Sequence, residues 1–214
     1  MTTTQTPAAK PPSNPVLRAW PVYVAILAVA AFLGLVFSQG SPKVAFRSAD
    51  ITGADYANDF HLTDMDGHPR SIVDYRGQAV MLFFGFTQCP SACPTELART
   101  AEVMRQLGPQ SSRVRMLFVT IDPERDTPEL LRNYVHAFDP NFVGLHADLA
   151  ATAETARRFK AFYQKVPQGG SYTMDHSTLT YIFDPQGRIR LIARPDLDAS
   201  AITADLRQLI AEPI

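Results

Sequence analysis

Apolar residues along the chain fall into runs with either strand-like or helix-like spacing. The stretch AVMLFFGF, Ala79 to Phe86, is apolar without a break, which is typical of a central strand covered on both faces. Thr95 to Leu107 follows with apolar residues at helical spacing, and the mostly apolar stretch Val114 to Ile121 predicts a second buried strand. The pattern predicts a strand, a helix and a second strand, with a polar loop that contains both cysteines before the helix.

Segments on both sides of these elements extend the pattern. Asp59 to Asp64 and Arg70 to Asp74 flank the sequence DMDG, which predicts a β-hairpin. After the second strand, DPERDTPE marks a turn and predicts a helix over Pro128 to Phe138, with Asp126 and Glu129 as a capping box.

The second half of the chain continues the alternation of strands and helices. A short strand is predicted near Phe142 to Leu145, and a helix over Ala151 to Phe162. Thr178 to Phe183 pairs with Arg188 to Ala193 across the turn DPQG, and Ala199 to Ile210 is the last helix. This order of elements predicts an α/β, thioredoxin-like fold with an N-terminal hairpin extension.

The N-terminal part differs in composition. Residues 1–18 are rich in Thr, Pro, Ala and Ser, which predicts a disordered tail. Residues 19–40 carry no charge and match the length of about 20 residues that a transmembrane helix needs. Trp20 and Tyr23 lie where an interfacial aromatic belt is expected. We expect an uncleaved transmembrane anchor; a cleaved signal peptide is the alternative, although no clear cleavage site follows the apolar run.

The charges on the two sides of this anchor indicate its orientation in the membrane. Lys10 and Arg18 precede the segment, and Lys43 and Arg47 follow it. With the amino terminus included, the positive-inside rule slightly favours a cytoplasmic tail. We therefore expect residues 41–54 to be a linker and residues 55–214 to be a folded domain outside the cytoplasm, where disulfide chemistry is available.

Composition excludes some functions. The 20 Lys and Arg residues balance 21 Asp and Glu residues, and they are scattered along the chain. No basic patch is present for nucleic acid, so we expect no nucleic-acid partner. Two cysteines form at most one bridge, so disulfides do not replace a hydrophobic core.

Cys89 and Cys93 are the candidate reactive residues. They lie at the start of a predicted helix, whose dipole favours the thiolate that attacks disulfides and binds metals. The C-x-x-x-C spacing is one residue longer than the thioredoxin redox motif, so the pair suits either a disulfide or a metal ion. Two buried free cysteines are the simplest alternative.

A metal held by two cysteines requires a further ligand, and His176 is the candidate. It precedes the strand Thr178 to Phe183, where a thioredoxin-like fold brings the chain over the cysteine loop. Two thiolates and an imidazole suit Cu(I), and the nitrogen also suits Cu(II), whereas a structural zinc site normally has four protein ligands. Met174 is expected to fill space in the core, with a role as a soft additional ligand as the alternative, and Asp175 either orients His176 or belongs to a turn. Surface or hydrogen-bonded polar roles are expected for the remaining histidines, His61, His68, His136 and His146.

Three motifs together carry a family resemblance. GFTQCPSACPTEL, VTIDPERDTPELLRNYVHAF and YTMDHSTLTYIFDPQGRI, in this order, resemble the Sco/SenC family of membrane-anchored copper proteins that assemble cytochrome c oxidase. The resemblance extends from Asp55 to Leu209. This sequence departs from the family pattern at Ser91, where an acidic residue is common, and at Phe86, where tyrosine is frequent.

The resemblance implies a thioredoxin-like fold and one copper ion bound by Cys89, Cys93 and His176. It also implies delivery of copper to the dinuclear centre of cytochrome c oxidase subunit II, or reduction of the cysteines of that centre. The domain is then expected in the periplasm, anchored to the bacterial inner membrane, with another periplasmic copper carrier as a further partner.

We therefore predict a copper chaperone rather than an enzyme in the strict sense. The principal alternative is a thiol-disulfide oxidoreductase in which Cys89 attacks and Cys93 resolves, without an essential metal. A cysteine-dependent peroxidase and a non-catalytic binding module are weaker alternatives.

Overall fold

The computed structural model describes residue 20, residues 23–32 and residues 45–212, which belong to two compact units, 1–45 and 46–214. In the first unit, residues 23–32 are helical and their side chains are exposed. Within the described ranges, no helix has both the length and the apolar character needed to cross a membrane. The predicted tail, and part of the predicted anchor over 19–40, lie outside the described residues.

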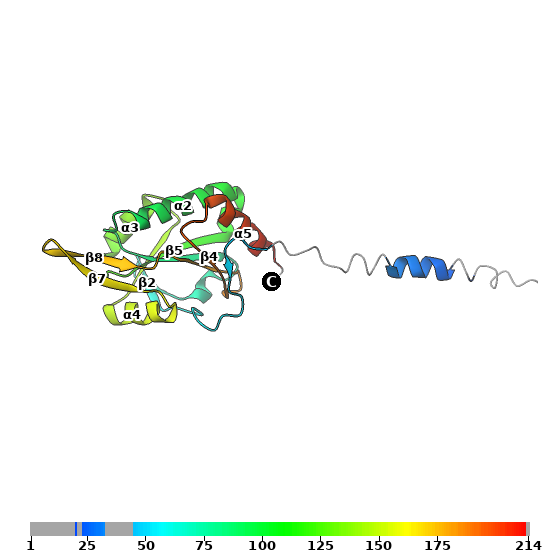
Figure 1. Cartoon of the computed structure of the whole chain (residues 1–214), viewed down its shortest axis with the longest axis horizontal. Coiled ribbons are helices and arrows are strands. Elements are labelled where there is room, and N and C mark those ends of the chain that lie inside the picture. The colour runs from blue at the N-terminus through cyan, green and yellow to red at the C-terminus, as the bar shows by residue number, and fades with distance from the viewer. Residues whose placement is uncertain (1–19, 21–22, 33–44, 213–214) are drawn as a thin grey trace, which may run out of the picture. The chain divides into compact units, whose positions relative to one another are not determined.

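An eight-stranded sheet forms the centre of the second unit (Figure 1). Strand β4 is parallel to β5 and antiparallel to β9, and β5 is parallel to β6. Every residue of β4 is buried, as its unbroken apolar run predicted. In sheet order the strands are β1 (Ala49–Asp50), β10 (Ile189–Ala193), β9 (Thr180–Phe183), β4 (Ala79–Gly85), β5 (Val114–Thr120), β6 (Val143–His146), β2 (Leu62–Asp64) and β3 (Pro69–Arg70).

Helices cover both faces of this sheet. Figure 1 shows α2 (Ala92–Leu107), α3 (Pro128–His136) and α5 (Ala199–Ala211) on one face and α4 (Leu149–Arg158) on the other. The folded unit also contains two 3-10 helices, η1 (Ile72–Tyr75) and η2 (Gly108–Arg113). The predicted α/β alternation of strands and helices is therefore confirmed.

Several boundaries differ from the prediction. Helix α2 begins at Ala92, so Cys93 lies in its first turn, and α4 ends at Arg158. The predicted hairpin pairs only over β2 and β3, because η1 begins at Ile72.

A second hairpin was not predicted. Strands β7 (Tyr163–Gln168) and β8 (Ser171–His176) form a separate antiparallel sheet that projects from the main body (Figure 1). Gly169 and Gly170 connect the strands with positive φ values of 53° and 85°, a conformation that glycine adopts without steric cost.

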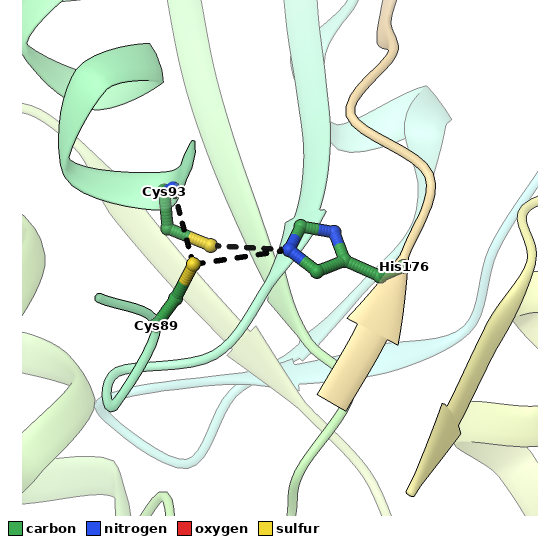
Figure 2. Close-up of side chains that lie close together, drawn as sticks. All are labelled: Cys89, Cys93 and His176. Atoms are coloured by element: carbon green, nitrogen blue, oxygen red, sulfur yellow. Dashed lines mark hydrogen bonds between the residues drawn. The ribbon is translucent and has the colours of Figure 1, made fainter. Parts of the chain in front are cut away.

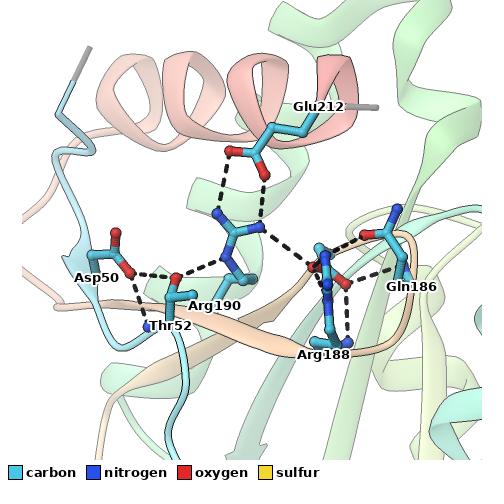
Figure 3. Close-up of polar contacts among 7 residues, drawn as sticks. Asp50, Thr52, Gln186, Arg188, Arg190 and Glu212 are labelled. Atoms are coloured by element: carbon cyan, nitrogen blue, oxygen red, sulfur yellow. Dashed lines mark hydrogen bonds and ion pairs between the residues drawn. The ribbon is translucent and has the colours of Figure 1, made fainter. Parts of the chain in front are cut away.

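The segment over 41–54, predicted as a linker, contributes to the folded unit from Phe46 onward. Strand β1 pairs with β10, and Arg190 reinforces this edge of the sheet (Figure 3). The Arg190 guanidinium donates to Thr52 Oγ1 at 2.8 Å and to Glu212, at the end of α5, at 2.7 and 3.2 Å. It also lies 3.4 Å from Asp184, so one buried cation joins β1, the β9–β10 turn and α5.

Candidate metal centre

The cysteine loop leaves the end of β4 and leads into α2. The Cys89 N–H donates to the Phe86 carbonyl at 3.2 Å, which closes a turn before the helix. Ser91, at the N-cap of α2, makes no side-chain capping bond, and the Cys89 sulfur instead accepts the Cys93 N–H at 3.4 Å. Cys89 is half-buried and Cys93 is fully buried, so the two sulfurs differ in their access to solvent.

Gly85 is the residue that makes room for the Cys93 sulfur. A Cβ atom at this position would lie 2.7 Å from Cys93 Sγ and 2.7 Å from Phe118 Cε2. These distances are well below van der Waals contact, so the absence of a side chain at Gly85 allows the sulfur to lie against the end of β4.

His176 completes the group. It lies at the end of β8, and its Nε2 atom faces both sulfurs, 3.6 Å from Cys93 Sγ and 4.0 Å from Cys89 Sγ (Figure 2). Phe83 and Phe86 contact the imidazole edge-on, with centroid distances of 5.9 and 5.8 Å.

The other imidazole nitrogen is held by a carbonyl. Nδ1 of His176 lies 2.9 Å from the Ser177 carbonyl oxygen, which only accepts hydrogen bonds, so Nδ1 carries the proton. In the neutral ring this leaves the Nε2 lone pair directed toward the sulfurs, the usual arrangement for a metal-binding histidine. The Ser177 carbonyl therefore orients the His176 ring, a role that the sequence analysis considered for Asp175.

The two thiols have different proton affinities. The hydrogen bond from the Cys93 thiol lowers the pKa of Cys89 to about 3. Partial burial opposes this shift, whereas the side chain of His176 and the backbone N–H groups of Cys93 and Ser91 add to it. The pKa of Cys93 is raised, because its proton is shared with Cys89 and its sulfur is buried. The reduced pair therefore holds one thiolate and one thiol near neutral pH.

The spacing of these atoms fits a three-coordinate metal ion. With metal bonds of about 2.3 Å to sulfur and about 2.0 Å to nitrogen at trigonal angles, each sulfur would lie about 3.7 Å from the nitrogen. The observed separations of 3.6 and 4.0 Å bracket this value. Cys89, Cys93 and His176 thus offer two soft sulfurs and one imidazole nitrogen within 4.8 Å of one another, a donor set that suits copper.

Asp126 anchors the cysteine loop. Its carboxylate accepts hydrogen bonds from Thr87 N at 3.1 Å, Thr87 Oγ1 at 2.6 Å and Thr120 Oγ1 at 2.6 Å. Burial raises the pKa of this carboxyl, and the hydrogen bonds oppose the shift. The prediction that Asp126 caps α3 was wrong: Thr127 is the N-cap, and its side chain accepts from Leu130 N.

The sequence-based reasoning left this acidic turn out of the site. The sequence did contain a signal that this turn lies near the cysteine loop. Asp126 follows the carboxyl end of β5, and the carboxyl ends of neighbouring parallel strands meet at one edge of a sheet.

Other residues considered from the sequence lie elsewhere. Met174 is buried in the core, as expected, and Asp175 is exposed. Among the residues that the structure describes, His176 alone of the histidines clusters with the cysteines. His68 belongs to a separate group with Asp64 and Asp66 at the β2–β3 turn.

Comparison with known proteins identifies the family. The SCO1/SenC family model matches residues 48–211, which is most of the chain. The chain belongs to the SCO1/SenC family. The family resemblance predicted from the three motifs is therefore confirmed.

Individual family members agree with this assignment. The mitochondrial SCO2 homologue of Mus musculus is 36% identical over 157 residues, which is 72% of this chain and 62% of that protein. The chain therefore spans about three fifths of the length of this relative.

Solved structures of family members share the fold. ScoI from Bradyrhizobium japonicum, determined with copper bound, is 37% identical, has a TM-score of 0.66, and is matched over 71% of this chain and 97% of its own. BsSco, described as a member of the Sco family of cytochrome c oxidase assembly proteins with a disulfide switch, is 24% identical with a TM-score of 0.59, over 75% of this chain and 98% of its own. At that identity BsSco supports the fold alone, and the thioredoxin-like Sco fold is confirmed.

Proposed function

We propose that this protein binds one copper ion through Cys89, Cys93 and His176 and carries it during assembly of cytochrome c oxidase. The observation that carries the proposal is the convergence of two sulfurs and the Nε2 lone pair at separations of 3.6 and 4.0 Å. The likeness to the copper-bound ScoI of Bradyrhizobium japonicum supports copper as the metal.

The route of transfer follows from ligand chemistry. Cu(I) is the form best suited to two thiolates, and the imidazole also accommodates Cu(II). Because Cys89 is half-buried whereas Cys93 is buried, an acceptor thiolate approaches the metal from the side of Cys89. Exchange of one ligand at a time then transfers copper without releasing a free ion.

We also propose the destination and the location. The acceptor is the dinuclear copper centre of cytochrome c oxidase subunit II, and another periplasmic copper carrier supplies the metal. Residues 19–40 anchor the protein in the bacterial inner membrane, with the folded domain in the periplasm. The apolar segment and the family assignment support this arrangement.

A Cu(I) competition titration tests the binding site. The reduced full-length protein is titrated against a chelator of known affinity, beside Cys89→Ser, Cys93→Ser and His176→Ala. We expect one tightly bound ion per chain, and affinity reduced at least about tenfold, or about 1.4 kcal/mol, in each variant. His136→Ala, an exposed histidine on α3, is the control and should match wild type. Tight binding that persists without Cys89, Cys93 or His176 would place copper elsewhere.

The unequal thiols favour a second candidate function, the reduction of a partner disulfide. The Cys89 thiolate attacks one partner sulfur, the partner S–S bond breaks, and the other partner sulfur leaves as a thiolate. Cys93 then gives its proton to a departing partner thiolate and attacks Cys89 Sγ, which breaks the mixed disulfide and releases the second partner sulfur. The pair ends as a disulfide, having given two electrons to the partner.

Trapping distinguishes this function from copper carriage. With metal-free protein, Cys93→Ser should accumulate a mixed disulfide through Cys89, because the resolving thiol is missing. A disulfide-containing peptide from subunit II is the substrate, and intact mass spectrometry detects the adduct. Absence of the adduct, together with tight copper binding, would leave copper carriage as the function.

A further inference from the structure

One turn contacts both segments that carry the candidate ligands. The turn Asp122–Asp126 follows β5, and its Asp126 carboxylate holds Thr87 in the cysteine loop. The neighbouring Arg125 reaches further. Its Nη1 donates to Gln88 Oε1 at 3.3 Å, beside Cys89, and to the Tyr172 carbonyl on β8 at 2.8 Å.

Arg125, Asp122 and Tyr172 form a closed set of contacts, here called the clamp. The Arg125 guanidinium carbon lies 3.7 Å from the centroid of the Tyr172 ring, and Nε donates to Asp122 Oδ2 at 2.5 Å. The Tyr172 hydroxyl donates to Asp122 Oδ1 at 2.8 Å. The Arg125 side chain is only 18% exposed and that of Asp122 is fully buried, so solvent screens these contacts weakly.

A second, more exposed pair of residues also contacts the Tyr172 ring and the turn. Lys165 on β7 lies 4.6 Å from the Tyr172 centroid and pairs with Glu124 from the same turn. Both strands of the hairpin are therefore connected to the turn. Because both side chains of this pair are well exposed, we assign the clamp to the buried contacts of Arg125.

The hairpin depends on such contacts for its position. Within the described residues, β7 and β8 pair only with each other and not with the eight-stranded sheet. At the base of the hairpin, Ser177 and Phe162 exchange hydrogen bonds of 2.9 and 3.0 Å. The clamp holds β8 at Tyr172, four residues before His176, and the Ser177–Phe162 bonds hold the chain just after it. Between these two attachments, Met174 packs in the core, so the polar contacts act together with this apolar one.

We propose that Arg125 is a positioning residue for the metal centre, which acts on copper affinity through His176 without touching the metal. It holds the β8 backbone against the turn that also holds the cysteine loop. The distance between His176 and the two cysteines is therefore kept constant. This inference rests on the proposed copper function. Its chemical basis is the planar guanidinium, which donates to several acceptors at once while stacking on an aromatic ring.

A double-mutant cycle tests the route of action. Arg125→Met retains most of the side-chain volume and loses the charge and all donors. We expect Cu(I) affinity about 10- to 100-fold weaker, as found for residues that orient metal ligands. In the His176→Ala background, the same substitution should weaken binding no further. Equal weakening in both backgrounds, or none in either, would overturn the proposal.

Two further variants separate positioning from general stabilisation. Arg125→Lys keeps the charge but not the fork of donors, and should recover part of the lost affinity. Arg190→Met is the matched control, because the Arg190 side chain is only 10% exposed and also pairs with a buried carboxylate, that of Asp184, at the β1–β10 edge of the sheet. It should leave affinity unchanged; a loss equal to that of Arg125→Met would show that general destabilisation is sufficient and would overturn the proposal.

Metal-free protein provides an independent measurement. In Arg125→Met, amide hydrogen exchange along β8 should be faster and the His176 ring resonances should broaden or shift, while exchange in β4 stays unchanged. Unchanged His176 resonances and β8 exchange would overturn the positioning role. If wild type fails to bind copper, or His176→Ala binds normally, the proposed function fails, and this measurement still decides the structural claim.

Discussion

Replacement of Gly85 by alanine perturbs the contact between β4 and the Cys93 sulfur. The new methyl group would lie 2.7 Å from Cys93 Sγ and from Phe118 Cε2. Non-bonded contacts of this kind are normally about 3.5–4.0 Å, so the sulfur and the ring must move by about 1 Å. Overpacking of a core costs about 1–3 kcal/mol, which corresponds to a fall in Tm of about 2–12 °C for a domain of this size.

This displacement also reaches the metal centre. Functional groups in a binding site must stay within about 0.5 Å of their working positions, and Cys93 Sγ is one of the two sulfurs that face His176. We therefore expect Gly85→Ala to weaken Cu(I) binding in addition to lowering Tm.

Gly144→Ala is the matched control. A Cβ at Gly144 on β6 would lie 2.7 Å from Leu131 Cδ2 and 3.2 Å from Met65 Cγ, and none of these contacts involves a site residue. Thermal unfolding of the reduced, metal-free proteins should show a lower Tm for both variants, and Cu(I) competition should show weaker binding for Gly85→Ala only. The reasoning is refuted if Gly85→Ala binds copper like wild type, or if Gly144→Ala loses as much affinity.

Three other predictions concern charge and stability. Because the pKa of Cys89 is lowered to about 3, its thiolate persists well below neutral pH. Its alkylation by iodoacetamide, followed by mass spectrometry on metal-free protein, should be nearly constant between about pH 8 and about pH 5; a tenfold fall per pH unit would indicate an ordinary thiol. Asp126→Ala should lower the free energy of unfolding in urea by about 3 kcal/mol, because the Thr87 and Thr120 donors lose their acceptor; a change below about 0.5 kcal/mol would contradict this. Arg190→Met should lower the free energy of unfolding by about 2 kcal/mol, because Thr52 and Glu212 lose the guanidinium donors, whereas Asp184 still pairs with Arg188. Cu(I) affinity should stay unchanged, and a parallel loss of affinity would count against the separation of the two regions.

The central strands, most of helix α2 and the family could be predicted from the amino-acid sequence. These features are local: β4 is an unbroken apolar run, β5 is mostly apolar, and the apolar residues of α2 recur every three to four positions. The two cysteines also lie within one turn of one another, so their proximity required no knowledge of the fold. His176 was identified because a thioredoxin-like fold brings the chain before β9 over the cysteine loop.

The contacts that hold the site together are visible only in the folded protein. Thr87 and Asp126 are 39 residues apart, and the Arg125 to Tyr172 contact spans 47 residues, so no local pattern reports them. The β7–β8 hairpin was missed for a related reason. Its strands lack a regular alternation of buried and exposed residues, since within the described ranges they pair only with each other. Propensity and periodicity report only on the local pattern of apolar and polar residues along the sequence. Three features of the site depend instead on contacts between segments that are distant in sequence: the orientation of His176, the space beside Gly85 and the clamp at Arg125. These contacts form only when the chain folds, so no local sequence pattern predicts them.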